Sequence, residues 1–407
     1  MSQQGPNLAA GASSTAHLHE KIIKPIGPLA VISHQMPLEI SDKINSELTA
    51  RRALAVENQA QLVEERGFLR RDYRTEVDLS RFSSGEGQAT LIDSVRGHDV
   101  FIISDVLNHG AYMSRMRKFV SLSPDDHYQD LLRIITATHG ITRRINVVMP
   151  YLYAGRRYRR VNRGSMDCAM MLKELFSYGV SNFITFDAHD ARVANAVPRN
   201  NFETFPTSYH MVKTLLDNYP DLQLDPEHFM VVAPDENTIN RCVYYASILK
   251  VPLGIFYRKR TKVRTLATTA EKAQKEFLGE NVKGKDVLIV DDMLDSGQTV
   301  MDCVIQLKDR GARRIFIAVS FAHFSRGWQL FDGAKDEGVI EKIFVSNLSY
   351  LPIEVREKSW FMEIDLSDYV AKIIDLVNFN QSLQKAIDPS RFIEARLAEH
   401  YKAQGKV

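Results

Sequence analysis

The most informative segment of the sequence is Asp291-Asp292-Met293-Leu294-Asp295-Ser296-Gly297-Gln298-Thr299, which follows the apolar run 287–290 and precedes an amphipathic helical pattern. In an open α/β sheet, ligands bind outside the carboxyl ends of the strands. Carboxylates there accept hydrogen bonds from vicinal hydroxyls or hold Mg2+ through water, and hydroxyls and N–H groups at a helix start bind phosphate. The segment therefore predicts a sugar-phosphate site. The alternative is a strand–turn–helix corner with solvated aspartates.

The composition is that of a globular protein with two or three domains: 407 residues, 44% hydrophobic and 25% charged. No apolar run is long enough for a bilayer, and residues 1–20 lack the pattern of a secretory signal, so we expect a cytoplasmic protein without a membrane partner. The formal net charge of +2 gives no overall attraction for nucleic acid, and no nucleic-acid partner is expected. Cys168, Cys242 and Cys303 are widely spaced, which favours buried reduced thiols.

Strand and helix patterns alternate along most of the chain. The predicted strands are residues 28–33, 99–104, 144–149, 182–186, 228–232, 253–256, 286–290 and 314–320, and the predicted helices are 38–53, 128–139, 167–178, 238–249 and 299–310. This alternation predicts an α/β protein with mainly parallel sheets flanked by helices. Residues 1–26 are expected to form a flexible tail. A break with two prolines at 198–206 separates an expected domain 27–205 from a second domain 206–407.

The segment 291–299 resembles the phosphoribosyl pyrophosphate (PRPP) loop of the phosphoribosyltransferase fold. The loop alone does not separate enzymes that make PRPP from enzymes that use it or regulators that bind it. Further segments, from about Arg81 to the C-terminal helix, occur in the order seen in the ribose-phosphate pyrophosphokinase (PRPP synthetase) family. The resemblance implies two phosphoribosyltransferase-like domains, an N-terminal one on the ATP side and a C-terminal one on the ribose 5-phosphate side. It also implies a last helix that packs back on the N-terminal domain.

The segment Arg81-Phe82-Ser83-Ser84-Gly85-Glu86, followed by 93–101, is similar to the first signature of this family. The resemblance implies that Phe82 stacks on the adenine of ATP and that Glu86 accepts a hydrogen bond from the adenine amino group. In the family these residues reach the ATP site across a subunit boundary. A homo-oligomer is therefore implied, built from dimers and as large as a hexamer. Without the resemblance, Phe82 is equally well explained as a core side chain at a strand turn.

The segment 150–160 occupies the place of the family's ATP-phosphate segment and contains Arg156 and Arg157. Guanidinium groups suit phosphate oxygens, and a nucleic-acid patch is the alternative. Asp187-Ala188-His189 resembles the family's Asp-Leu-His, which implies that His189 and, more loosely, Asp187 hold Mg2+ on the ATP phosphates. Two polar groups in a loop are the simpler explanation of that pair.

Asp235 ends the apolar run 231–234 and is implied to support the ribose or a second metal ion. Arg241 follows at the distance where the family has an arginine. A basic segment resembling the family's loop over the reacting phosphates begins with the implied catalytic residues Arg258, Lys259 and Arg260. The residues implied to bind ribose 5-phosphate are Asp235, Asp291, Asp292, Asp295, Ser296, Gly297, Gln298 and Thr299.

The resemblance implies transfer of the β,γ-diphosphoryl group of Mg-ATP to the C1 hydroxyl of ribose 5-phosphate, which gives PRPP and AMP. Such a reaction needs alignment and charge neutralisation more than covalent help. The departures from the family pattern are on the ATP side: Ser84, Arg157, Tyr158, Asn237, Thr238 and Arg258. Two alternatives follow from them. One is a catalytically weak paralogue that regulates a true synthetase, and the other is a PRPP-using phosphoribosyltransferase or PRPP sensor.

Overall fold

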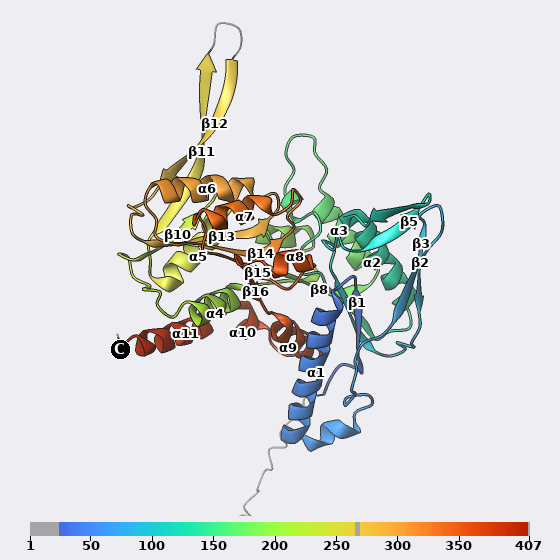
Figure 1. Ribbon diagram of the computed structural model, residues 1–407. Coiled ribbons are helices and arrows are strands. Elements are labelled where there is room, and N and C mark those ends of the chain that lie inside the picture. The colour runs from blue at the N-terminus through green and yellow to red at the C-terminus, as the bar shows by residue number, and fades with distance from the viewer. Residues whose placement is uncertain (1–23, 265–268, 406–407) are drawn as a thin grey trace, which may run out of the picture.

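The computed structural model describes residues 24–264 and 269–405, without the side chains of 259–274. The N-terminal half is built on a five-stranded sheet in the order β1-β4-β7-β8-β9, in which all neighbours are parallel. Its strands are β1 (Leu29–His34), β4 (Asp99–Ser104), β7 (Arg144–Val148), β8 (Val180–Phe186) and β9 (Asn201–Phe205). Most are continuous apolar runs because helices cover both faces of the sheet (Figure 1).

The C-terminal half is built on a seven-stranded sheet in the order β12-β11-β10-β13-β14-β15-β16, parallel except for the β11–β12 pair. Its strands are β10 (Phe229–Ala233), β11 (Leu253–Arg264), β12 (Thr269–Leu278), β13 (Asp286–Leu294), β14 (Ile315–Ala322), β15 (Lys342–Ser346) and β16 (Phe361–Ile364). The predicted fold class, two mainly parallel sheets flanked by helices, is confirmed.

Helices cover the two sheets, and short hairpins extend from the N-terminal half (Figure 1). The helices are α1 (Leu38–Asn58), α2 (Pro124–Thr138), α3 (Asp167–Ser177), α4 (Ser208–Asn218), α5 (Ile239–Leu249), α6 (Gln298–Asp309), α7 (Gln329–Asp336), α8 (Ile353–Arg356), α9 (Ser367–Asn378), α10 (Gln384–Ile387) and α11 (Ser390–Ala403). The hairpin strands are β2 (Val77–Arg81), β3 (Gly87–Leu91), β5 (Tyr112–Arg115) and β6 (Lys118–Ser121). Among the described residues, no helix is both long and apolar enough to cross a bilayer.

One strand lies where the sequence predicted a break. β9 falls inside 198–206 and completes the N-terminal sheet next to β8. The sequence did not predict this strand because it begins with a polar residue, Asn201. The side chain of Asn201 donates to Asn182, which in turn donates to Asn146 at 2.5 Å. Amides on three neighbouring strands therefore satisfy one another. The boundary at 205–206 stays our proposal, because β9 ends there and α4 already contacts β16 of the C-terminal sheet.

The end of the chain does not pack as the resemblance implied. The last helix, α11, contacts α4 and α5 of the C-terminal half, and it is α9 that lies against α1. Arg52 of α1 is fully buried there, with its guanidinium donating to Asp375 at 3.1 Å and Asn378 at 2.6 Å. Asn378 also donates to Asp99 at the start of β4, at 2.8 Å. Helix α9 is therefore part of the N-terminal half's structure.

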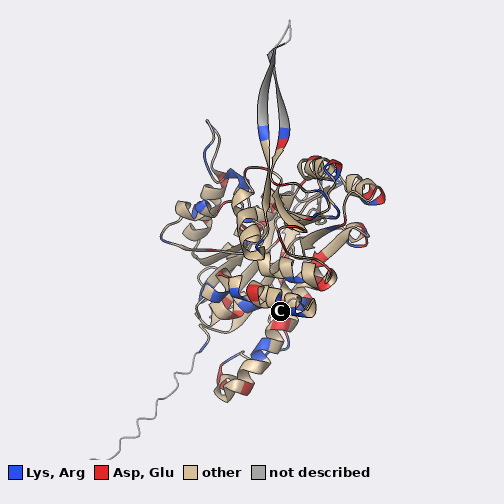
Figure 2. Ribbon diagram, turned by 90° about the vertical axis from the view of Figure 1, so that its left-hand side faces the viewer, with Lys and Arg blue, Asp and Glu red and all other residues tan. Residues whose placement is uncertain are grey.

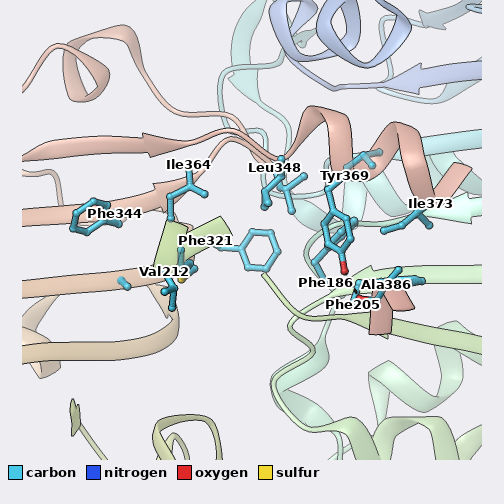
Figure 3. Close-up of a cluster of buried hydrophobic side chains, with 14 of the residues drawn as sticks. Phe186, Phe205, Val212, Phe321, Phe344, Leu348, Ile364, Tyr369, Ile373 and Ala386 are labelled. Carbon is cyan, nitrogen blue, oxygen red and sulfur yellow. Dashed lines mark hydrogen bonds between the residues drawn. The ribbon is translucent and has the colours of Figure 1, made fainter. Parts of the chain in front are cut away.

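One hydrophobic core continues across both halves (Figure 3). Phe186 and Phe205 come from the N-terminal sheet, Phe321 and Ile364 come from the C-terminal sheet, and Tyr369 of α9 lies between them. Close-packed interiors of this kind leave few voids and are hard to compress, so the two sheets are held in one arrangement. The ends of β8 and β13 are thereby fixed opposite each other.

Candidate functional site

A cleft of about 720 Å³ lies between the loops that follow β7 and β8 and those that follow β10 and β13. It brings together most of the residues expected from the sequence. The expected residues that line it are Arg156, Arg157, His189, Asp235, Asp291, Asp292, Asp295, Ser296, Gly297 and Thr299. Cations from the N-terminal half thus face carboxylates and hydroxyls from the C-terminal half, as the sheet-edge argument predicted.

Two adjacent carboxylates at the end of β13 have opposite properties. His189 Nδ1 lies 2.7 Å from Asp292 Oδ2. Burial opposes ionisation of Asp292, but the His189 hydrogen bond and the charge of Arg241 prevail and hold its pKa below the usual range. Burial and the neighbouring charge of Asp292 raise the pKa of Asp291 well above its usual range. The hydrogen bond with Asp292 raises the pKa of His189. Asp292 therefore carries the negative charge of the pair.

The turn from β13 into α6 forms an anion cradle. Gly297 precedes the helix with a φ of +76°, and no side chain caps the first turn. A Cβ at this position would lie 2.2 Å from Cζ of Phe331, so both the backbone angle and the space require glycine. Ser296 and Thr299 line the cleft, and neither hydroxyl has a hydrogen-bond partner within 24–264 or 269–405. Hydroxyls and uncapped N–H groups at a helix start suit a phosphate.

The opposite wall carries arginines. The short helix η2 (Gly155–Arg157) places Arg156 Nη1 3.5 Å from Asp295 Oδ2, and both side chains are more than two-fifths exposed. An exposed pair at that distance contributes little energy, so the guanidinium stays available to an anion. The ring of Tyr158 lies 5.9 Å from that of His189 and has the guanidinium of Arg192 at 5.4 Å. This wall suits the phosphates of a nucleotide.

Comparison with known proteins agrees with this geometry. Residues 31–179 match the model of the N-terminal domain of ribose phosphate pyrophosphokinase, and residues 200–347 match that of the phosphoribosyl transferase domain. The chain belongs to the ribose-phosphate pyrophosphokinase family. Ribose-phosphate pyrophosphokinase 1 of Streptococcus agalactiae is 26% identical over 316 residues, which cover 77% of this chain and 89% of that protein. The Streptococcus pyogenes serotype M1 protein of the same name is 28% identical over 299 residues, 73% of this chain and 84% of its own length.

A solved structure extends the comparison to the fold. Phosphoribosylpyrophosphate synthetase from Mycobacterium smegmatis superposes with a TM-score of 0.68 at 18% identity and covers 87% of this chain and 99% of that one. The similarity in fold therefore extends over both sheets and the connection between them.

The structure gives Asp187 a different setting from the one that the family resemblance implied. Its carboxylate accepts hydrogen bonds from Thr207 and Ser320, the latter at 2.5 Å, and pairs with Arg241 Nη1 at 3.0 Å. Both oxygen atoms therefore have protein partners. Arg241 also donates to the Asp187 carbonyl at 3.2 Å, and Asp187 itself has a φ of +41°. Thr207 and Ser320 are distant in sequence, and no local pattern marks them.

Besides Asp187, four expected residues with described side chains do not line the cleft of this chain. Phe82 and Glu86 lie at the turn between β2 and β3, where Phe82 is 58% exposed and Glu86 accepts from Ser84 Oγ at 2.8 Å. Gln298 donates to Asp302 along α6 at 2.8 Å. Arg258 is exposed, and its backbone N–H donates to Glu236 at 2.7 Å. The side chains of Lys259 and Arg260 fall outside the described residues.

The basic segment after residue 256 was expected to be a loop. Its described residues instead form two long strands, β11 and β12, which project from the body of the molecule (Figure 1). Alternating residues such as Arg258 and Arg260 fit an antiparallel ladder as well as a loop, and only the partner strand distinguishes the two cases.

The cleft suits a divalent metal ion that is bound together with phosphate. In the part of the chain that the structure describes, no three His, Cys, Asp or Glu side chains are arranged to hold a metal ion by themselves. Mg2+ commonly binds one or two carboxylates and takes its other oxygen ligands from water and substrate phosphates. The negative charge of Asp292 lies at the cleft beside His189, so it would attract a cation that is shared with a phosphate.

Proposed function

We propose that this chain is a ribose-phosphate diphosphokinase, which transfers the β,γ-diphosphoryl group of Mg-ATP to the C1 hydroxyl of ribose 5-phosphate and releases AMP and PRPP. The observation that carries the proposal is a single cleft in which Arg156 and His189 of one half face the phosphate cradle and aspartates of the other. A simple phosphoribosyltransferase is not favoured, because residues 31–179 match a domain named for the pyrophosphokinases.

The acceptor occupies the C-terminal wall in this proposal. The hydroxyls and N–H groups of Ser296 to Thr299 hold the 5-phosphate, with the Gln298 side chain kept away by Asp302. Asp291 and Asp292 accept hydrogen bonds from the ribose hydroxyls. Asp295 and Asp235, which also line the cleft, flank the sugar. The C1 hydroxyl is thereby held toward the arginine wall, which is the alignment that phosphoryl transfer requires.

The donor occupies the N-terminal wall. Arg156 and Arg157 bind the ATP phosphates, and Arg258, Lys259 and Arg260 add positive charge from the hairpin. Mg2+ would be held at His189 and Asp292 and would neutralise phosphate charge when bound. Asp187 instead positions His189, which lies two residues further along the chain. Arg241, Thr207 and Ser320 hold the Asp187 carboxylate in place.

The adenine site is completed by a second copy of the chain in this proposal. Phe82 is exposed and lies outside the cleft of its own chain, as a residue that serves a neighbouring subunit must. We expect light scattering to give a molar mass of two or more chains, and we place the protein in the cytoplasm without a nucleic-acid partner. A monomer with full activity would contradict the shared site.

Purified protein with Mg-ATP and ribose 5-phosphate is expected to form AMP and PRPP in equal amounts. Chromatography of the nucleotides together with an enzymatic assay of PRPP measures both products. Omission of ribose 5-phosphate is the control and should abolish AMP formation. Bound ribose 5-phosphate without AMP above the blank would favour the regulatory paralogue. Conversion of PRPP and a nucleobase to a nucleotide would favour the phosphoribosyltransferase.

A further inference from the structure

Lys275 of β12 lies directly behind the phosphate cradle. Its Nζ donates to the carbonyl of Thr299 at 2.9 Å and the carbonyl of Pro234 at 3.0 Å, and it lies 3.3 Å from Sγ of Cys303. Thr299 and Cys303 belong to the first turns of α6, and Pro234 follows β10 next to Asp235. One ammonium group therefore joins the hairpin, the cradle and the end of β10.

The direct partners of the Lys275 ammonium group are neutral: two backbone carbonyls and a thiol. No described carboxylate forms an ion pair with this ammonium group. It lies instead at the start of α6, where the helix already carries partial positive charge on its N–H groups. A cation in this position is unfavourable unless an anion binds nearby. The arrangement resembles a phosphate site whose positive charge is present before the phosphate arrives.

The surroundings of Lys275 strengthen its electrostatic effect. Cys303 is fully buried, and burial raises the pKa of its thiol to about 11, so the sulfur stays uncharged. The contacts of the ammonium group are partly buried, so its charge acts on the cradle with less screening than in bulk water. Its contact with Thr299 is to the carbonyl of a residue that lines the cleft. The ammonium itself does not line the cleft, so it acts on a ligand through the cradle.

Lys275 also lies at the base of the hairpin. It stands opposite Arg258 in the β11–β12 ladder, so the two side chains belong to the same face of the hairpin. Charged residues are visible at that base, where the hairpin leaves the body (Figure 2). Lys275, which contacts the cradle, and Arg258, the first implied catalytic residue of the hairpin, are thus cross-strand neighbours.

We propose that Lys275 is a positioning residue that sets the affinity of the cradle for the 5-phosphate of its substrate. Its ammonium supplies positive charge behind the first turn of α6, and its hydrogen bonds hold that turn against the end of β10. The inference rests on the proposed function, which assigns the cradle to ribose 5-phosphate. We expect Lys275 to affect the binding of phosphate monoesters specifically.

The test compares Lys275→Met with Lys275→Arg and with Lys283→Met. Methionine keeps an unbranched side chain and removes the charge, and arginine restores the charge. Lys283 is an exposed lysine beside Gly311, at the end of α6 opposite the cradle. Calorimetry of ribose 5-phosphate binding should show a Kd about tenfold higher in Lys275→Met, because the variant loses one partly buried positive charge that attracts the phosphate. Lys275→Arg should recover most of the affinity, and Lys283→Met should match the wild type.

Three further measurements separate this role from a general structural one. The KM for ATP should change much less than the KM for ribose 5-phosphate, and inorganic phosphate should compete more weakly in Lys275→Met. Melting temperatures show whether Lys275→Met folds. If Lys275→Met does not fold, Lys275→Gln is measured in its place. An unchanged Kd in a folded Lys275→Met or Lys275→Gln variant, or an equal rise in both KM values, would overturn the inference. If wild-type protein binds ribose 5-phosphate but forms no AMP, the proposed diphosphokinase activity is contradicted, whereas the inference about Lys275 is not.

Discussion

Asp292→Ala is expected to lower the turnover number of the diphosphokinase reaction about a hundredfold to a thousandfold, the usual effect of removing one preorganised polar group from a reaction site. The carboxylate of Asp292 is the charged member of its pair and holds His189 at 2.7 Å. Its removal leaves His189 without its partner and removes an acceptor for the ribose. Steady-state kinetics measures the effect.

The fold should survive this substitution. Arg241 keeps its ion pair with Asp187, so the substitution leaves no unpaired guanidinium in the interior. Asp309→Ala is the matched control, because Asp309 is exposed at the C-terminal end of α6, the helix that follows β13, whereas the cradle lies at its N-terminal end. A turnover number near that of the wild type in Asp292→Ala would remove the proposed role of this residue.

Gly297→Ala is expected to raise the KM for ribose 5-phosphate about a hundredfold, since displacing a bound group by about 1 Å has effects of that size. Alanine at a φ of +76° is strained by about 1 kcal/mol, and its Cβ would lie 2.2 Å from Cζ of Phe331. Either the buried ring or the turn must move, and a moved turn misplaces the N–H groups that hold the phosphate.

Gly284→Ala separates the effect of strain from the effect of position. Gly284 has a φ of +77°, but nothing lies within 4 Å of a Cβ built there. Both variants therefore carry the same backbone strain, and only Gly297→Ala disturbs the cradle. Equal KM values for ribose 5-phosphate in the two variants would show that the turn does not hold the phosphate.

The corner from β13 to α6 could be predicted from the sequence because every signal for it is local. The apolar run 287–290, the glycine at 297 and the helical pattern after it all act over a few residues. The observed strand nevertheless continues to Leu294, because pairing with β14 extends it beyond the apolar run. The cleft residues followed from the rule that parallel strands expose their carboxyl ends at one edge.

The setting of Asp187 could not be predicted in this way. Its partners Thr207, Arg241 and Ser320 lie 20, 54 and 133 residues away and meet only when both sheets are formed. The hairpin β11–β12 and the strand β9 were missed for a related reason. Both depend on pairing with a neighbouring strand, and the sequence of a single strand does not show its neighbour.

The pairing of α1 with α9 has a consequence for synthesis on the ribosome. The guanidinium of Arg52 is buried against Asp375 and Asn378, which are translated 323 and 326 residues later. Until α9 emerges, a compact N-terminal half would bury an unpaired charge, which costs several kcal/mol. The N-terminal half therefore cannot pair the guanidinium of Arg52 as in the finished protein before most of the C-terminal half has been translated.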